Sequence, residues 1–220
     1  MAPPIVTTTV QATILSVISN LLAQAITAHQ SNTPFTIDWI TVFQYSLFAA
    51  LSTPPNFLWQ GFLESTFPAF PTSSSSSASK SKEPNGTDAK TTKQEPRLSK
   101  RNTLLKLLLD QTAGAAFNTI TFSLFIHSFR QATAHHYSPA SSSSTGTSTG
   151  LFRPSAVSWT PTWTASRAEF WPLVRAGWRF WPWVALGNYV FLTSVEARSL
   201  AGALAGLAWG VYICLVTAAK

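Results

Sequence analysis

Uncharged, mostly apolar stretches alternate with two serine-rich polar segments along this chain. The first stretch, about 7–28, contains no charged residue. Its polar side chains recur every three or four positions, at Thr9, Thr13, Ser16, Asn20 and Gln24. This spacing places them on one helical face, opposite a face of Val, Ile and Leu. The pattern predicts a helix with one lipid-like side and one polar side that faces other helices.

Two further helices are predicted from the next apolar stretches. Asp38 is placed to start a second helix over 38–65, and we expect Pro54-Pro55 to break it because proline removes a backbone donor and clashes with the preceding turn. The third helix is predicted over 103–131. The first two helices form segment 1–71 of the predicted domain organisation, and the third helix forms segment 103–131.

The C-terminal segment, 165–220, combines an amphipathic piece with two short apolar stretches. The piece over 165–177 is expected to lie at the membrane surface. The stretches over 178–195 and 200–218 are separated by a polar break that contains Glu196 and Arg198. Because a helix needs about 20 residues to cross a bilayer, the two stretches are either two spans or one span plus a re-entrant piece.

A row of glycines marks the last stretch. Gly202, Gly206 and Gly210 follow one another at four-residue spacing. Small residues on one face let two membrane helices approach closely. We therefore predict that this face packs on an earlier helix of the chain, with a second copy of the chain as the alternative.

Composition supports a membrane protein. Only 10% of the 220 residues are charged, against about 25% in an average soluble domain. The Ser-rich segments 72–102 and 132–164 are predicted to be low-complexity loops, the first of them basic and disordered. The predicted fold is an all-α polytopic membrane helix bundle of four to five transmembrane helices, and the alternative is an all-α soluble bundle.

Enzymatic chemistry finds no support in the sequence. No nucleophile, P-loop or dinucleotide-binding motif is present, and the single Cys214 excludes a disulfide framework and a Cys-based metal site. We expect no enzyme activity, no cofactor and no metal. The loop 72–102 has no aromatic residue for base stacking, which argues against nucleic acid as a partner.

Polar residues inside the apolar stretches are the remaining candidates for function. They are Asn20, Gln24, Asp110, Gln111, Asn118 and Asn188. A carboxylate such as that of Asp110 is unfavourable in lipid and usually faces a bundle interior or a water-filled path. These residues therefore either line a path for solutes or form hydrogen bonds between helices.

Aromatic, proline and polar residues occur in an order that resembles the Mpv-seventeen family, which includes the twenty-two-kilodalton peroxisomal membrane protein. The C-terminal part of this pattern consists of Trp171, Pro172, Trp178, Trp181, Pro182, Asn188, Tyr189, Trp209 and Tyr212. Upstream, Pro54, Trp59, Asp110-Gln111 and Gln24 are similar to family positions. Departures include Asn20, where the family has Asp, and Ala185, where it often has Gln.

This resemblance implies an integral organelle-membrane protein, channel-like, that affects small-solute or ion permeability and organelle homeostasis. A structural membrane protein without transport activity is the alternative. Of the two organelles that the family implies, we expect the mitochondrial inner membrane rather than the peroxisome. The expected partners are membrane lipids, with a homo-oligomer left open.

Overall fold

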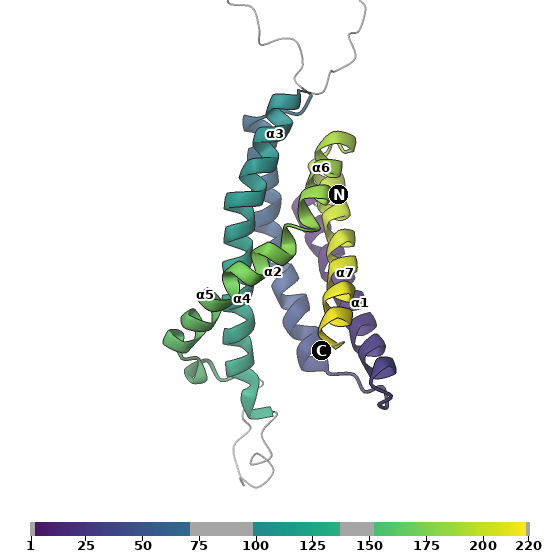
Figure 1. Cartoon of the computed structure of the whole chain (residues 1–220), viewed down its shortest axis with the longest axis vertical. Coiled ribbons are helices and arrows are strands. Elements are labelled where there is room, and N and C mark those ends of the chain that lie inside the picture. Colours follow the sequence, from purple (N-terminus) through teal and green to yellow (C-terminus); the bar gives the residue numbers. More distant parts are fainter. Residues whose placement is uncertain (1–2, 71–98, 137–151, 219–220) are drawn as a thin grey trace, which may run out of the picture.

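The computed structural model describes residues 3–70, 99–136 and 152–218. Every regular element in these ranges is a helix, so the predicted all-α fold class is confirmed (Figure 1). Most of the predicted loop 72–102 and much of the segment 132–164 lie outside the described residues.

The first helix is longer than the sequence predicted, and the second is shifted by one residue from its predicted range. Helix α1 spans Pro4–Gln30, and α2 spans Trp39–Thr66 with Asp38 as its N-cap. The prediction that α2 breaks at Pro54-Pro55 was wrong, since the helix is continuous through both prolines. Proline fixes φ near its helical value, and such residues are tolerated where neighbouring groups take up the freed backbone. Helix α1 packs along this helix and helps to hold it.

The third predicted helix is a composite. It consists of α3 (Lys100–Leu109), the π-helical turn η1 (Asp110–Gly114) and α4 (Ala115–Thr133), which run without interruption (Figure 1). It starts within the segment that was predicted to be a loop. The Ser99 hydroxyl caps it by accepting a hydrogen bond from the Asn102 backbone, and the Ser99 N–H donates to the Ala69 carbonyl, so both contacts extend the helix to this point.

Among the described residues after 152, the α-helices are α5 (Trp159–Gly177), α6 (Trp181–Phe191) and α7 (Val195–Ala218). Two predicted boundaries were wrong. Helix α5 begins before residue 165, because Gln131 of α4 accepts from the Ser158 N–H at 2.7 Å and so caps its start. The break between the last two helices is at 192–194, and Glu196 and Arg198 belong to the beginning of α7.

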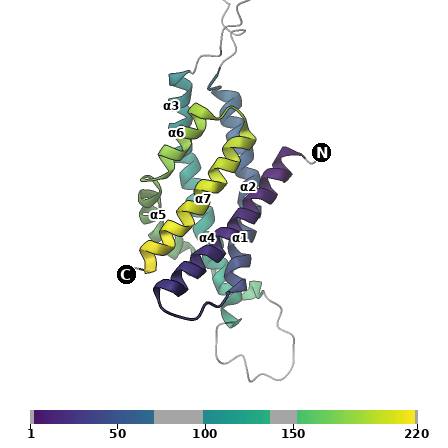
Figure 2. The same cartoon turned by 90° about the vertical axis from the view of Figure 1, so that its right-hand side faces the viewer.

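The helices pack in two groups that meet where α2 contacts α4 and where α3 contacts α6. Helix α1 lies beside α2 and α7, as Figures 1 and 2 both show, while α5 packs along α4. The short α6 contacts α3 and α7 and joins the groups. Between α2 and α4 lies an aromatic contact in which Phe48 meets Phe122 and Phe125 with ring centroids 5.2 and 5.4 Å apart.

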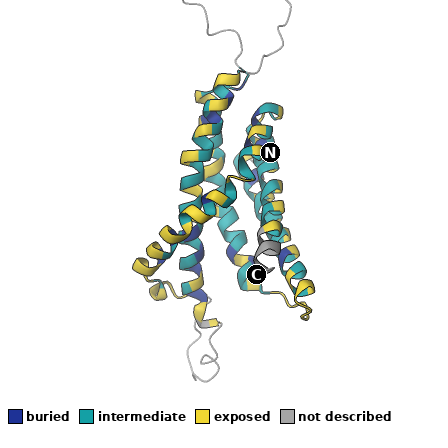
Figure 3. Ribbon diagram, in the orientation of Figure 1, coloured by how far each residue is buried: buried dark blue, intermediate teal, exposed yellow. Residues whose placement is uncertain are grey.

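Large apolar side chains cover much of the outside of the bundle, where Figure 3 shows exposed and intermediate residues along every helix. The most exposed include Leu58, Phe117, Trp183 and Phe191. Apolar surface of this extent marks an interaction with a membrane or another protein. Helix α1 is long and apolar enough to cross a membrane, and it alone meets that criterion among the described residues. The span count of four to five stays a prediction.

Helix α7 packs on α1, an earlier helix of the chain, and its row of glycines meets α1 at Gly210. A Cβ added at Gly210 would lie 2.7 Å from the Ser19 hydroxyl oxygen, and that hydroxyl donates to the Leu207 carbonyl at 3.3 Å. A Cβ at Gly202 or Gly206 would have no atom within 4 Å. The close approach that was predicted for all three glycines therefore occurs at Gly210.

Candidate functional site

Glu64, in the last turn of α2, contacts two cationic side chains that come from two other helices. Its Oε2 accepts a hydrogen bond from Lys106 Nζ of α3 at 2.7 Å and another from Arg198 Nη1 of α7. Its Oε1 accepts from the Ala69 backbone N–H at 3.1 Å. A single carboxylate oxygen thus joins two cations and links α2, α3 and α7.

Both cations are buried. Lys106 is 0% exposed and Arg198 is 2% exposed, whereas 25% of the Glu64 side chain remains exposed. The Tyr189 ring of α6 lies beside both, with Lys106 Nζ 4.8 Å and Arg198 Cζ 5.5 Å from its centroid. Cations at such distances are attracted to an aromatic face, more strongly when they are desolvated. Removal of ions from water is unfavourable, and these contacts compensate for part of that penalty.

Asp110, about one helical turn beyond Lys106, continues the polar contacts. Its Oδ1 accepts from Gln60 Nε2 at 2.9 Å and from Trp59 Nε1 at 3.3 Å, and its Oδ2 accepts from Gln111 Nε2 at 3.2 Å. Gln60 Oε1 in turn accepts from the Tyr189 hydroxyl at 3.2 Å. Polar contacts therefore run from Asp110 through Gln60 and Tyr189 to the three charges. We call this set of residues the buried polar cluster. Its members are Trp59, Gln60, Glu64, Lys106, Asp110, Gln111, Tyr189 and Arg198.

The π-helical turn places Asp110 at this position. The turn covers Asp110–Gly114, and the glycine that ends it lies against α2. A Cβ at Gly114 would be 3.0 Å from Trp59 Nε1 and 3.3 Å from Asp110 Oδ1. The Trp59–Asp110 hydrogen bond requires close approach of α2 to this turn. A side chain larger than that of Gly114 would clash with both partners of the bond.

Arg198 is fixed by the turn that joins α6 to α7. Its Nε donates to the Leu192 carbonyl at 2.8 Å, and the Arg198 carbonyl accepts from Asn188 Nδ2 at 3.4 Å. Its Nη2 is buried and has no hydrogen-bond partner among the described residues. Two of its three guanidinium nitrogens are thus used within the protein.

The structure gathers only some of the predicted polar residues at this site. Asp110 and Gln111 belong to the buried polar cluster, and the Asn188 side chain donates to the backbone carbonyl of Arg198. Trp178 donates to the Gln111 carbonyl at 3.0 Å. Asn118 is exposed and makes no hydrogen bond with the described residues.

Asn20 and Gln24 serve a separate contact. Gln24 Nε2 donates to Asn20 Oδ1 at 2.8 Å and to the Asp38 carbonyl at 3.2 Å, while Gln24 Oε1 accepts from the Asp38 N–H at 2.8 Å. These bonds tie the start of α2 to α1. The amide of Gln24 is therefore used by a connection between two helices.

Sequence reasoning missed four members of the cluster: Gln60, Glu64, Lys106 and Arg198. Arg198 was interpreted as part of a polar break between the last two apolar stretches. Glu64 is the only acid between Asp38 and residue 71, and an isolated acid beside an apolar stretch is a signal that could have indicated a buried partner.

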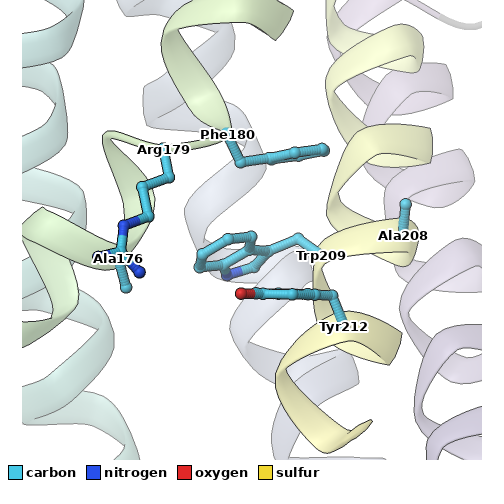
Figure 4. Close-up of a pocket in the computed structure, with 6 residues that line it drawn as sticks. All are labelled: Ala176, Arg179, Phe180, Ala208, Trp209 and Tyr212. Carbon is cyan, nitrogen blue, oxygen red and sulfur yellow. The ribbon is translucent and has the colours of Figure 1, made fainter. Parts of the chain in front are cut away.

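A second feature is an aromatic hollow of about 310 Å³ between the end of α5 and α7. Figure 4 shows its lining, in which the rings of Phe180, Trp209 and Tyr212 lie in layers with Arg179 opposite. Phe180 and Trp209 stack with centroids 5.6 Å apart. Among the described residues, no group of three or more His, Cys, Asp or Glu side chains could hold a metal ion.

The C-terminal helices carry the match to known proteins. Residues 155–214 match the sequence model of the Mpv17 / PMP22 family. This part of the chain is thus similar to the Mpv17 / PMP22 family. The matched segment holds Tyr189 and Arg198 of the cluster and the C-terminal Trp and Pro residues on which the resemblance rested.

The family consists of organelle membrane proteins. Searches of curated proteins and of solved structures returned no significant match. The similarity of Pro54, Trp59 and Asp110-Gln111 to family positions lies outside the matched segment. In the structure, Trp59 donates a hydrogen bond to Asp110, so these two positions together connect α2 to the π-helical turn.

Proposed function

We propose that this chain is a multi-pass organelle-membrane protein that conducts small polar solutes or ions and carries out no catalysis. The observation that supports this most is the buried polar cluster, which brings two cations, two carboxyl groups and a tyrosine hydroxyl between α2, α3, α6 and α7. Ionisable groups within a membrane bundle are unfavourable, and they commonly mark paths for ions or solutes.

In this proposal, the arrangement is the closed state of the path. Lys106 and Arg198 both point at Glu64, so the charges that would attract a solute are neutralised by one another. Opening then requires that Glu64 separates from at least one cation. A gate with two discrete pairings is the kind of element on which switching depends.

A structural role is the second candidate, and a specific observation favours it. Nearly all cluster groups are hydrogen-bonded helix to helix, as expected for polar residues that hold a bundle together. Gln24 and Asn20 likewise connect α1 to the start of α2. A scaffold of this kind needs no continuous path for solutes.

Flux through reconstituted protein separates the two candidates. The full chain would be placed in liposomes, and the entry of ions and of small uncharged solutes would be measured against empty vesicles over a range of potentials and pH. We expect flux that rises in Lys106→Met, because this change releases one constraint on Glu64. The exposed Arg130 of α4 provides the matched control, Arg130→Met, with unchanged flux.

Absence of flux in the wild type under every condition would contradict conduction and leave the structural role.

For location, we propose the mitochondrial inner membrane, with lipids as partners and no nucleic-acid partner. Whether the chain forms a homo-oligomer is left open. Fractionation of a tagged chain into mitochondria or peroxisomes tests the location directly.

A further inference from the structure

We propose that Lys106 and Arg198 form a binding site for a small oxyanion, such as phosphate or a carboxylate group. This inference rests on the proposed function, because it assigns the class of solute that the buried polar cluster attracts. Three observations carry it: the local charge, an unused guanidinium nitrogen, and the exposure of Glu64.

The local charge is positive. Two cations, Lys106 and Arg198, share one oxygen of one carboxylate, Glu64 Oε2. The next acid, Asp110, forms no ion pair with either cation among the described residues and accepts its hydrogen bonds from Gln60 and other neutral groups. One of the two cations therefore has no carboxylate of its own at this end of the bundle.

The unused donor belongs to Arg198. Its Nε bonds the Leu192 carbonyl and its Nη1 bonds Glu64, but its Nη2 is buried without a partner. A buried donor without a partner is unfavourable, and a guanidinium edge fits the oxygens of phosphate or carboxylate. The Thr103 hydroxyl, three residues before Lys106 on α3, is also buried without a partner and is a second unused donor on that helix.

The cluster is open to its surroundings at Glu64. This side chain retains 25% exposure while both cations are covered. It lies in the last turn of α2, at the end of the bundle where α3 begins (Figure 1). An oxyanion that approaches from this side would meet Glu64 first and could displace it from Arg198, which is the separation that opening requires.

Thermal unfolding of the purified full chain in detergent tests the site without any flux measurement. Sodium phosphate and sodium acetate would be titrated against sodium chloride at equal ionic strength, with tryptophan fluorescence as the signal. A ligand that binds the folded state raises the melting temperature in a saturable way. We expect phosphate and acetate to do so beyond the effect of chloride.

Arg198→Lys is the decisive variant, since it keeps a cation for Glu64 and removes the free Nη2. Its apparent phosphate affinity should fall about tenfold, the change expected for loss of one charge-assisted hydrogen bond. Thr103→Val gives a second variant, with a smaller loss, in case the first does not fold. The exposed Arg130→Lys is the control and should bind as the wild type does.

The outcomes separate this inference from conduction. Equal effects of phosphate, acetate and chloride, or an unchanged response in both Arg198→Lys and Thr103→Val, would overturn the oxyanion site even if the liposomes conduct. A saturable phosphate effect that Arg198→Lys weakens would support the site even if no flux is found, and in that case conduction alone would fail.

Discussion

Replacement of Glu64 by glutamine would keep the shape of the side chain and remove the negative charge that Lys106 and Arg198 share. Loss of one partner from a buried ion pair typically destabilises a protein by about 3–5 kcal/mol, because a charge is left uncompensated. Two cations lose their partner here, but 25% of the Glu64 side chain is exposed, which lets water reach the site. We therefore expect Glu64→Gln to lower the free energy of unfolding by about 3 kcal/mol.

Denaturant unfolding in detergent, followed by tryptophan fluorescence, measures this change. Glu196→Gln is the matched control. Glu196 lies in the first turn of α7, near Arg198 in the sequence, but its side chain is exposed. The control should alter stability by no more than about 0.5 kcal/mol. If Glu64→Gln unfolds within about 1 kcal/mol of the wild type, the three charges are not coupled as argued.

A compensated triple variant sharpens the test. Glu64→Leu, Lys106→Met and Arg198→Met together remove every charge of the contact and leave apolar groups of similar length. Apolar replacement of a buried ion cluster is often neutral or stabilising, so the triple variant should be more stable than Glu64→Gln. A triple variant less stable than the single one would indicate that the charges contribute net stability.

Three further predictions follow from other contacts. Gly210→Leu should destabilise the α1–α7 contact by about 1–3 kcal/mol, the usual range for overpacking, whereas Gly206→Ala has open space around its Cβ and should not lower the melting temperature. Gln24→Leu should lower the free energy of unfolding by about 1–3 kcal/mol because it leaves the backbone N–H of Asp38 without its acceptor; retention of wild-type stability would refute this. Asp110→Asn should be milder than Asp110→Leu in the same unfolding assay, because only the leucine variant leaves both Gln60 and Trp59 without an acceptor.

Helical periodicity and apolar runs were enough to predict the helices but not their ends. The apolar stretches located α1, α2, α4 and α7, because each must bury or shield a continuous apolar face. The start of α5 depends on Gln131, which caps it from another helix. The continuity of α2 through Pro54-Pro55 depends on packing around it. Contacts between distant segments leave no local signal in the sequence.

The same distinction applies to the site. Asp110 was predicted because a carboxylate inside an apolar stretch is conspicuous on its own. Glu64 could have been singled out as an isolated acid, but Lys106 and Arg198 lie near the ends of apolar stretches, where a cation is ordinary, and only the fold brings them to Glu64. Their pairing could not be predicted from one sequence, because the spacing between them exceeds the range over which helical periodicity carries information.

The uninterrupted helix from α3 to α4 has a further consequence for depth in a bilayer. From Lys100 to Thr133 it is about 50 Å long at 1.5 Å per residue, which exceeds a hydrocarbon layer of about 30 Å. In the multi-pass arrangement proposed above, both of its ends would reach the headgroups or the water beyond. Lys106 lies about 15 Å from its midpoint, which is the depth where hydrocarbon gives way to headgroups when the helix is centred. Glu64, Lys106 and Arg198 would then lie at a membrane surface, at the entrance of the proposed path. Asp110 and its amide neighbours would be the polar groups within the lipid layer itself.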